Sequence, residues 1–231
     1  MKLLTLRKLH KWVGLVVGVQ LLLWCVSGLM FAWLDHGDIN GEHLAAPLPL
    51  VALPADQPLA EPSTWLEQYA DRAVHEVRLH PLDGAWFYRV AHDRGIELRR
   101  AADGTPYRLD AAAARRLASS YYRGGGTLTA VTYHAGETLE SRTLGPTWQA
   151  RFDDAARTSL YLSAGDGTLA AARGDTWRLF DFFWMLHTTD YAGRDDFNNP
   201  LVILAGTAAL WIALTGMLLL FRVFRRSDFG F

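Results

Sequence analysis

The chain has 231 residues, half of them hydrophobic, with 23 basic and 24 acidic side chains and a formal net charge of −1. Residues 1–11 and 222–231 together carry +6, which leaves −7 between them, and an acidic central segment argues against nucleic acid as a partner. The single cysteine, Cys25, excludes a disulfide framework and a cysteine zinc site within one chain.

The first predicted element is a transmembrane helix at residues 12–34, which follows the basic N-terminus, residues 1–11. This stretch holds no charge, and about 20 helical residues cross a hydrocarbon core of about 30 Å. A cleaved signal peptide is the alternative, but this run is longer than such peptides use, and no small-residue cleavage site directly follows it. Gly14 and Gly18 form a GxxxG pattern, which favours close helix packing and self-association.

Residues 35–59 are predicted to form a stalk, because four prolines there break regular structure. Two units follow, at residues 60–108 and 109–174, each with the pattern of one helix and three strands. The expected helices are 62–73 and 110–122, and the expected strands are 74–80, 86–92, 96–101, 128–134, 148–153 and 158–163. Each unit closes with an Asp-Gly-Thr turn, at Asp103 and Asp166, which indicates two α+β units in tandem.

An aromatic segment at residues 175–196 precedes the second apolar run. Trp and Phe recur at helical spacing from 176 to 189, which predicts an amphipathic helix at the membrane interface, followed by a polar linker. The second transmembrane helix is expected at residues 197–221, which are uncharged, and a basic tail at 222–231 follows it. Because both ends of the chain are basic, the positive-inside rule places both in the cytoplasm.

Several short segments carry a resemblance to a known family. They are Arg7-Lys8-Leu9-His10-Lys11-Trp12, Leu186-His187-Thr188-Thr189-Asp190-Tyr191, Phe197-Asn198-Asn199-Pro200-Leu201, and the pairs Ser27-Gly28 and Thr215-Gly216. With them the chain resembles the PepSY-associated transmembrane family in its short, two-span form. The resemblance implies a bacterial inner-membrane protein. The expected fold class is an α+β membrane protein, with two transmembrane helices flanking a periplasmic domain of two tandem PepSY-like helix-plus-three-strand units.

The resemblance implies two kinds of function. Larger relatives with four spans resemble haem-containing reductases of iron–siderophore complexes, in which histidines at helix ends hold b-type haem and pass electrons across the membrane. Other PepSY proteins resemble inhibitors or chaperone-like partners of peptidases and have no redox role.

Three histidines are candidate ligands of b-type haem: His10 at the inner end of the first span, and His187 and His43 near the outer surface. Such a haem usually takes two imidazoles in an apolar site. One protomer offers no second histidine near His10, so a homodimer would supply that residue twice, whereas His187 could pair with His43 or with its own copy. Asp190 is expected to orient His187 through its other ring nitrogen.

Ordinary roles for these residues stay open: His10 as an interfacial anchor, His187 as the partner of Asp190 or of a backbone carbonyl, and His43 as a solvated side chain. The leading hypothesis is b-type haem electron transfer, or a part in iron–siderophore reduction and iron uptake, by a homodimer with a periplasmic redox partner. The alternative is a non-enzymatic, membrane-anchored periplasmic binding module that modulates a partner protein such as a peptidase. The sequence shows no catalytic constellation, so it leaves enzymatic activity undecided.

Overall fold

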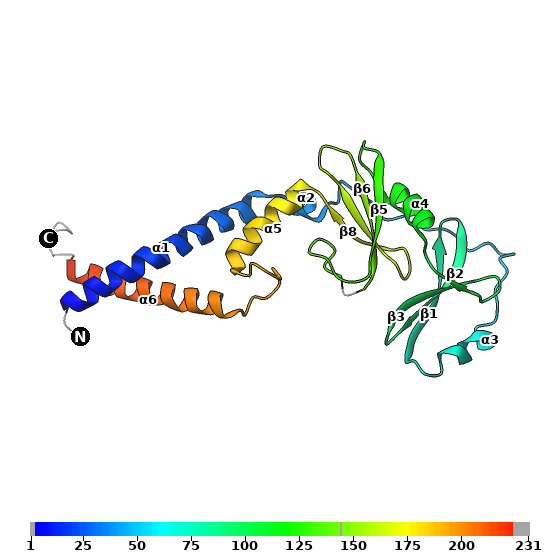
Figure 1. The fold of residues 1–231 in the computed structure, drawn as a ribbon, viewed down its shortest axis with the longest axis horizontal. Helices are drawn as coiled ribbons and strands as arrows, with labels where there is room; N and C mark the ends of the chain where they lie inside the picture. The colour runs from blue at the N-terminus through cyan, green and yellow to red at the C-terminus, as the bar shows by residue number, and fades with distance from the viewer. Residues whose placement is uncertain (1–2, 144, 224–231) are drawn as a thin grey trace. The chain divides into compact units, whose positions relative to one another are not determined.

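The computed structural model describes residues 3–143 and 145–223 (Figure 1). The chain divides into two compact units. One, the helical unit, comprises residues 1–35 and 179–231, and the other, the sheet unit, comprises residues 36–178. Met1 and Lys2 of the predicted basic N-terminus, and all but the first two residues of the predicted basic tail, lie outside the described residues.

Two long apolar helices dominate the helical unit: α1 (Leu3–Trp33) and α6 (Pro200–Val223). By length and composition each can cross a membrane, since an 18-residue window within Thr5–Trp33 has a mean hydropathy of 2.2 and one within Pro200–Phe221 has 2.1. Many of their large apolar side chains are exposed, as expected of helices that a bilayer covers. The prediction of two apolar helices is therefore confirmed. α1 begins earlier than predicted because nothing in the basic segment before it breaks a helix.

Helix α5 (Asp175–Thr188) carries the aromatic segment, and from Leu179 onward it belongs to the helical unit. Phe180 and Trp184 pack on Phe31 of α1, with ring centroids 5.1 and 5.9 Å apart. Aromatic pairs of this kind contribute about 0.5–1.5 kcal/mol beyond their buried area. The helix ends where Thr189 adopts a left-handed backbone, with φ of 55°. The aromatic face predicted from the sequence is thus packed on α1.

The first sheet of the sheet unit has four antiparallel strands in sequence order: β1 (Val74–Leu82), β2 (Ala85–His92), β3 (Gly95–Arg100) and β4 (Pro106–Tyr107). Two short helices, α3 (Ser63–Leu66) and η1 (Glu67–Tyr69), cover one face. Tyr88 and Val90 of β2 pack there with Trp65, while Phe87, on the opposite face, joins the main core. Strand β2 is therefore buried on both sides.

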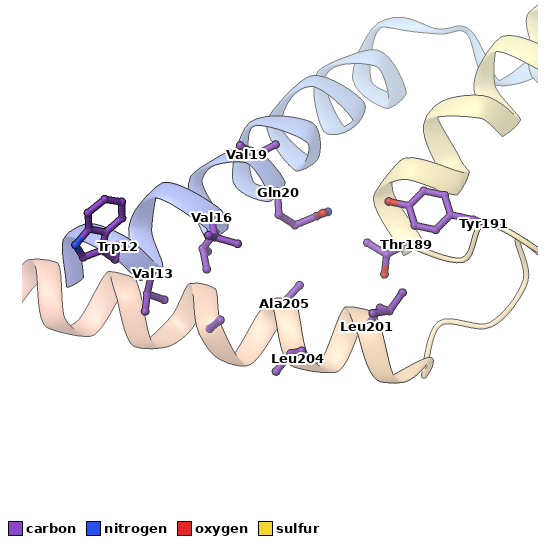
Figure 2. A pocket seen from close by; sticks show the side chains of 12 residues that line it. Trp12, Val13, Val16, Val19, Gln20, Thr189, Tyr191, Leu201, Leu204 and Ala205 are labelled. Atoms are coloured by element: carbon purple, nitrogen blue, oxygen red, sulfur yellow. The ribbon is translucent and has the colours of Figure 1, made fainter. Parts of the chain in front are cut away.

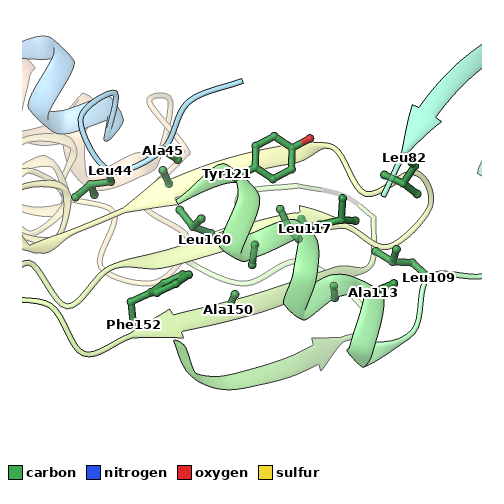
Figure 3. Close-up of a cluster of buried hydrophobic side chains, with 14 of the residues drawn as sticks. Leu44, Ala45, Leu82, Leu109, Ala113, Leu117, Tyr121, Ala150, Phe152 and Leu160 are labelled. Atoms are coloured by element: carbon green, nitrogen blue, oxygen red, sulfur yellow. The ribbon is translucent and has the colours of Figure 1, made fainter. Parts of the chain in front are cut away.

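The second sheet is built in the same way from β5 (Leu128–His134), β6 (Thr147–Phe152), β7 (Ser159–Ser163) and β8 (Leu169–Arg173). Helix α4 (Ala111–Tyr121) packs on this sheet, and Figure 3 shows its Leu117 in the main core beside Leu160. The buried positions of α4 recur at three- and four-residue spacing, as in an amphipathic helix. Its start is fixed by Asp110, whose carboxylate accepts from the backbone N–H of Ala113 at 2.7 Å.

The two sheets share one core and one buried ion pair. Leu82, Phe87 and Leu98 of the first sheet belong to the same buried cluster as α4 and the second sheet. Arg89 donates from Nε to the buried carboxylate of Asp166 at 2.8 Å, and His80 Nε2 lies 3.0 Å from the Asp166 carbonyl oxygen. Burial acts to raise the pKa of Asp166, but hydrogen bonds from Arg89, Thr168 and Ser163 hold that pKa below its usual value.

Part of the predicted stalk is docked on the sheet unit. Residues 36–40 form the short helix α2 (His36–Asn40), and Leu44 and Ala45 are buried in the main core. The Arg123 N–H donates to the Leu44 carbonyl at 2.9 Å, so this segment is hydrogen-bonded to the chain that follows α4. Residues 46–59 of the predicted stalk contain no helix or strand.

Each sheet has four strands where the sequence predicted three. The missed strands are β4, which is two residues long, and β8, whose Leu-Ala-Ala-Ala-Arg sequence has a weak strand propensity. Both Asp-Gly-Thr turns link a third strand to a fourth, with Gly104 and Gly167 at φ of 72° and 73°. The helix predicted at 62–73 is shorter, ending with η1, because the chain turns into β1 directly afterwards.

Candidate functional site

His10 on α1 is held by a hydroxyl group on α6. Its Nδ1 lies 2.7 Å from Thr215 Oγ1, and that hydroxyl donates its own proton to the Trp211 carbonyl at 2.8 Å. A hydroxyl that gives its one proton to the Trp211 carbonyl accepts from His10, and this arrangement puts the imidazole proton on Nδ1. The Nε2 atom then carries the free lone pair, and the structure shows no described residue bonded to it.

The surroundings of His10 are tight and largely apolar. The Trp211 ring lies 6.4 Å from the imidazole, centroid to centroid. A Cβ atom at Gly216 would lie 3.3 Å from His10 Cε1, closer than such contacts ordinarily come. The glycine after Thr215 therefore makes room for the ring that Thr215 binds.

His187, near the end of α5, has the same arrangement. Its Nδ1 lies 2.8 Å from Oγ of the fully buried Ser27 on α1, and Ser27 donates to the Leu23 carbonyl at 2.7 Å. As at His10, a hydroxyl that donates to a carbonyl accepts from the ring, so this arrangement puts the proton on His187 Nδ1 and leaves Nε2 free. Trp24 Nε1 donates to the His187 carbonyl at 2.8 Å, and the Phe31 ring contacts the imidazole edge-on at 5.2 Å.

The two histidines lie at separate ends of α1. Ser27 follows His10 by 17 positions, which is about 25 Å along a helix at 1.5 Å per residue. The two imidazoles cannot bind one iron within a single chain. Burial lowers the pKa of His187, so its ring is neutral at pH 7, the form that ligates metals.

His43 and Asp190 have other partners. His43 belongs to the sheet unit, where its half-exposed ring lies 3.2 Å from Asp38 Oδ1. The Asp190 carboxylate accepts from four backbone N–H groups at 3.0–3.2 Å, those of Ala192, Gly193, Asp195 and Asp196. These bonds lower its pKa to about 2. Asp190 was predicted to bond the His187 ring, but the hydroxyl at His187 Nδ1 is that of Ser27.

The sequence assigned no role to Ser27 or Thr215. Both hydroxyls lie inside apolar helices, where a Ser or Thr ordinarily bonds only its own backbone. The available signal was that each precedes a glycine, in the pairs Ser27-Gly28 and Thr215-Gly216.

The sheet unit has a polar cavity of 510 Å³. It is lined from both halves of the sheet unit, by residues that include Tyr69, Arg72, Glu97, Arg99 and Tyr133. Arg99 donates hydrogen bonds to Tyr69, Gly104 and Gln68. Arg72 Nη1 pairs with Glu97 at 2.5 Å. The buried Arg72 Nε makes no hydrogen bond to a described residue and lies 3.8 Å from Asp71 Oδ1.

One comparison with known proteins gives a match. The family model described as the PepSY-associated TM region matches residues 7–231, which include His10, His187 and all but the first six residues of the two units. Neither a curated protein nor a solved structure matches the chain.

Proposed function

This chain belongs to the PepSY-associated transmembrane family, and from that premise we propose that it is an inner-membrane protein that binds b-type haem and transfers electrons as a homodimer. The proposed orientation has both termini in the cytoplasm and the sheet unit in the periplasm. The basic residues outside the two apolar helices and the acidic charge between them support that orientation.

The observation that carries the proposal is the pairing of each histidine with a hydroxyl. Metal-ligating histidines nearly always donate their second ring N–H to a fixed acceptor, which sets the tautomer and the ring orientation. His10 and His187 both do this, with Thr215 and Ser27 as acceptors, and both leave Nε2 free beside aromatic rings. The donor set therefore fits an axial ligand of haem.

One chain offers one such imidazole at each end of α1. Two copies of the chain would supply a second imidazole at each end, and this is why the proposal includes a homodimer. Haem held in this way supplies reversible one-electron chemistry. His10 and His187 would bind the iron, while Thr215 and Ser27 hold the rings in the ligating tautomer. His43 remains a proposed additional ligand, and a ferric siderophore is the proposed periplasmic acceptor.

The visible spectrum of the purified protein tests the proposal. Protein expressed with ample haem and purified in mild detergent should show a Soret band that shifts on reduction by dithionite. His10→Ala and His187→Ala should each lower the haem content, whereas His75→Ala, at an exposed position of β1, should not. A colourless wild-type protein, or unchanged haem in both histidine variants, would rule out these ligands.

The polar cavity of the sheet unit supports a second candidate function. In this second proposal the protein is a non-enzymatic periplasmic module that binds a partner protein, with a carboxylate of the partner pairing with the arginine side chains that line the cavity. Arg108 lines the same cavity and is exposed, so a photo-crosslinking amino acid placed there should capture the partner in intact cells. The matched control places it at His75. Crosslinks to copies of the same chain alone would contradict this candidate.

A further inference from the structure

Within the helical unit, a cavity lies between α1 and α6 beyond the point where the two helices contact each other. A Cβ atom at Gly14 would meet Ile212 of α6 at 3.6 Å, whereas one at Gly18 would meet nothing within 4 Å. Figure 2 shows the cavity that opens as the two helices diverge. Its volume is 690 Å³, within the range of small-molecule sites, and its walls are mostly apolar. The lining includes Val13, Val16, Val17, Leu201, Leu204 and Ala205.

One polar side chain is directed into this cavity from the middle of α1. Gln20 is the ninth of the 23 residues in the uncharged stretch 12–34, and Figure 2 shows its amide pointing into the cavity. Its Nε2 is buried and makes no hydrogen bond to any described residue. The hydrocarbon of a bilayer has no acceptor to offer, so a ligand oxygen in the cavity would satisfy this group.

A second polar group faces Gln20 across the cavity. The hydroxyl of Tyr191, in the loop three residues after α5, points toward Gln20 (Figure 2), and the structure gives it no bond to a described residue. The neighbouring Thr189 hydroxyl is already used, because it donates to the Thr188 carbonyl at 2.7 Å. The cavity therefore has apolar walls and two polar groups on opposite sides.

We propose that this cavity binds the head group of an isoprenoid quinone, a role that goes beyond haem binding and does not depend on it. A quinone is an apolar, flat ring with two oxygen atoms at opposite ends, which matches one donor from Gln20 and one from Tyr191. A carboxamide also suits both redox forms, because its NH₂ donates to a quinone carbonyl and its C=O accepts from a quinol hydroxyl.

Two other occupants fit less well. A lipid acyl chain would fill the apolar space, but it carries no acceptor at the depth of Gln20. A helix from a second copy, about 10 Å across, would fill 690 Å³ with only about six residues. Such a helix could enter only if α1 and α6 moved apart.

Binding of a decyl-substituted benzoquinone to the haem-free, full-length protein in detergent tests the proposal. The wild type should bind one quinone per chain. Gln20→Leu and Tyr191→Phe should each weaken binding about three- to tenfold, which corresponds to one hydrogen bond. Ala205→Phe should abolish binding because its ring fills the cavity. The control Thr207→Val removes a hydroxyl from the same helix outside the lining residues and should bind as the wild type does.

Two results would overturn the proposal: quinone affinity unchanged in both Gln20→Leu and Ala205→Phe, or a wild-type dimer that becomes a monomer in Gln20→Leu while quinone binding is absent. The second result would assign Gln20 to a contact between copies. Because quinone binding is measured on haem-free protein, its result does not depend on whether the earlier experiment finds a Soret band.

Discussion

Arg89 on β2 and Asp166 in the turn before β8 join the two sheets of the sheet unit, with Arg89 Nε 2.8 Å from Asp166 Oδ2. The Asp166 side chain is 2% exposed and that of Arg89 is 13% exposed. The pair is therefore shielded from water. Arg89 also pairs with Glu76 at 2.7 Å, whereas loss of Arg89 leaves the buried Asp166 carboxylate without its counter-charge.

We predict that Arg89→Met lowers the free energy of unfolding by about 3–5 kcal/mol, because the buried Asp166 carboxylate loses its counter-charge. Arg78→Met is the matched control. Arg78 pairs with Glu76 at the surface, where an ion pair contributes at most about 1 kcal/mol. Urea unfolding of the full-length protein in detergent, followed by near-ultraviolet circular dichroism, measures both. Equal losses for the two variants would contradict the structural role of the buried pair.

The same carboxylate should make the protein sensitive to acid. Because the pKa of Asp166 is lower in the folded protein than in the unfolded chain, its stabilisation is present above the unfolded value of about 3.9. It is lost as the pH falls through the lower, folded value. The free energy of unfolding of Asp166→Asn should therefore fall less between pH 5 and acid pH than that of the wild type. A pH slope that the substitution leaves unchanged would contradict this assignment.

The outline of the fold could be predicted because it depends on local patterns. The uncharged runs identify two helices, and alternating residues between Gly-containing turns identify β1, β2, β3 and β5. β8 could not be found in this way, since its alanines become a strand only by pairing with β7. The docking of Leu44 depends equally on tertiary contacts, which proline content does not reveal.

The candidate site was predictable in part. Residue type and position in the chain singled out His10 and His187. Their hydroxyl partners depend on how α1 is rotated against α6 and α5, and a single sequence does not encode that rotation in any local pattern. Asp190 stands close to His187 in sequence, but its oxygens are taken by the backbone of its own loop.

A comparison of two glycines should separate backbone strain from steric overlap. Gly84 and Gly104 have φ of 78° and 72°, but a Cβ atom meets nothing within 4 Å at Gly84 and lies 2.5 Å from Trp65 Cδ1 at Gly104. We expect Gly84→Ala to cost about 1–2 kcal/mol, the strain of a left-handed residue. Gly104→Ala should cost more, because Trp65 must also move. Thermal unfolding measures both, and equal costs would mean that the Trp65 contact is relieved without loss.

Gly216 should be essential for the position of His10. The Cβ of Gly216→Val would crowd His10 Cε1 and push the imidazole away from Thr215. Gly206→Val is the control on the same helix, since a Cβ there meets nothing within 4 Å. We expect Gly216→Val to reduce the haem content in the same way as His10→Ala, and Gly206→Val to retain it. Haem per chain, from the pyridine haemochrome spectrum, distinguishes these outcomes.

Ser27 should act on haem binding only through His187. Ser27→Ala removes the acceptor at Nδ1 but leaves the bond from Trp24 to the His187 carbonyl, so α5 stays in place while the ring is free to turn. Loss of such a partner typically weakens metal binding by about 10–100-fold. Haem titration should show that loss, with a shifted midpoint potential, and Ser27→Thr should restore both. Thr207→Val, which removes a hydroxyl that contacts no histidine, serves as the control. A Ser27→Ala protein with wild-type haem affinity and potential would show that the hydroxyl holds the helices together and does not prepare a ligand.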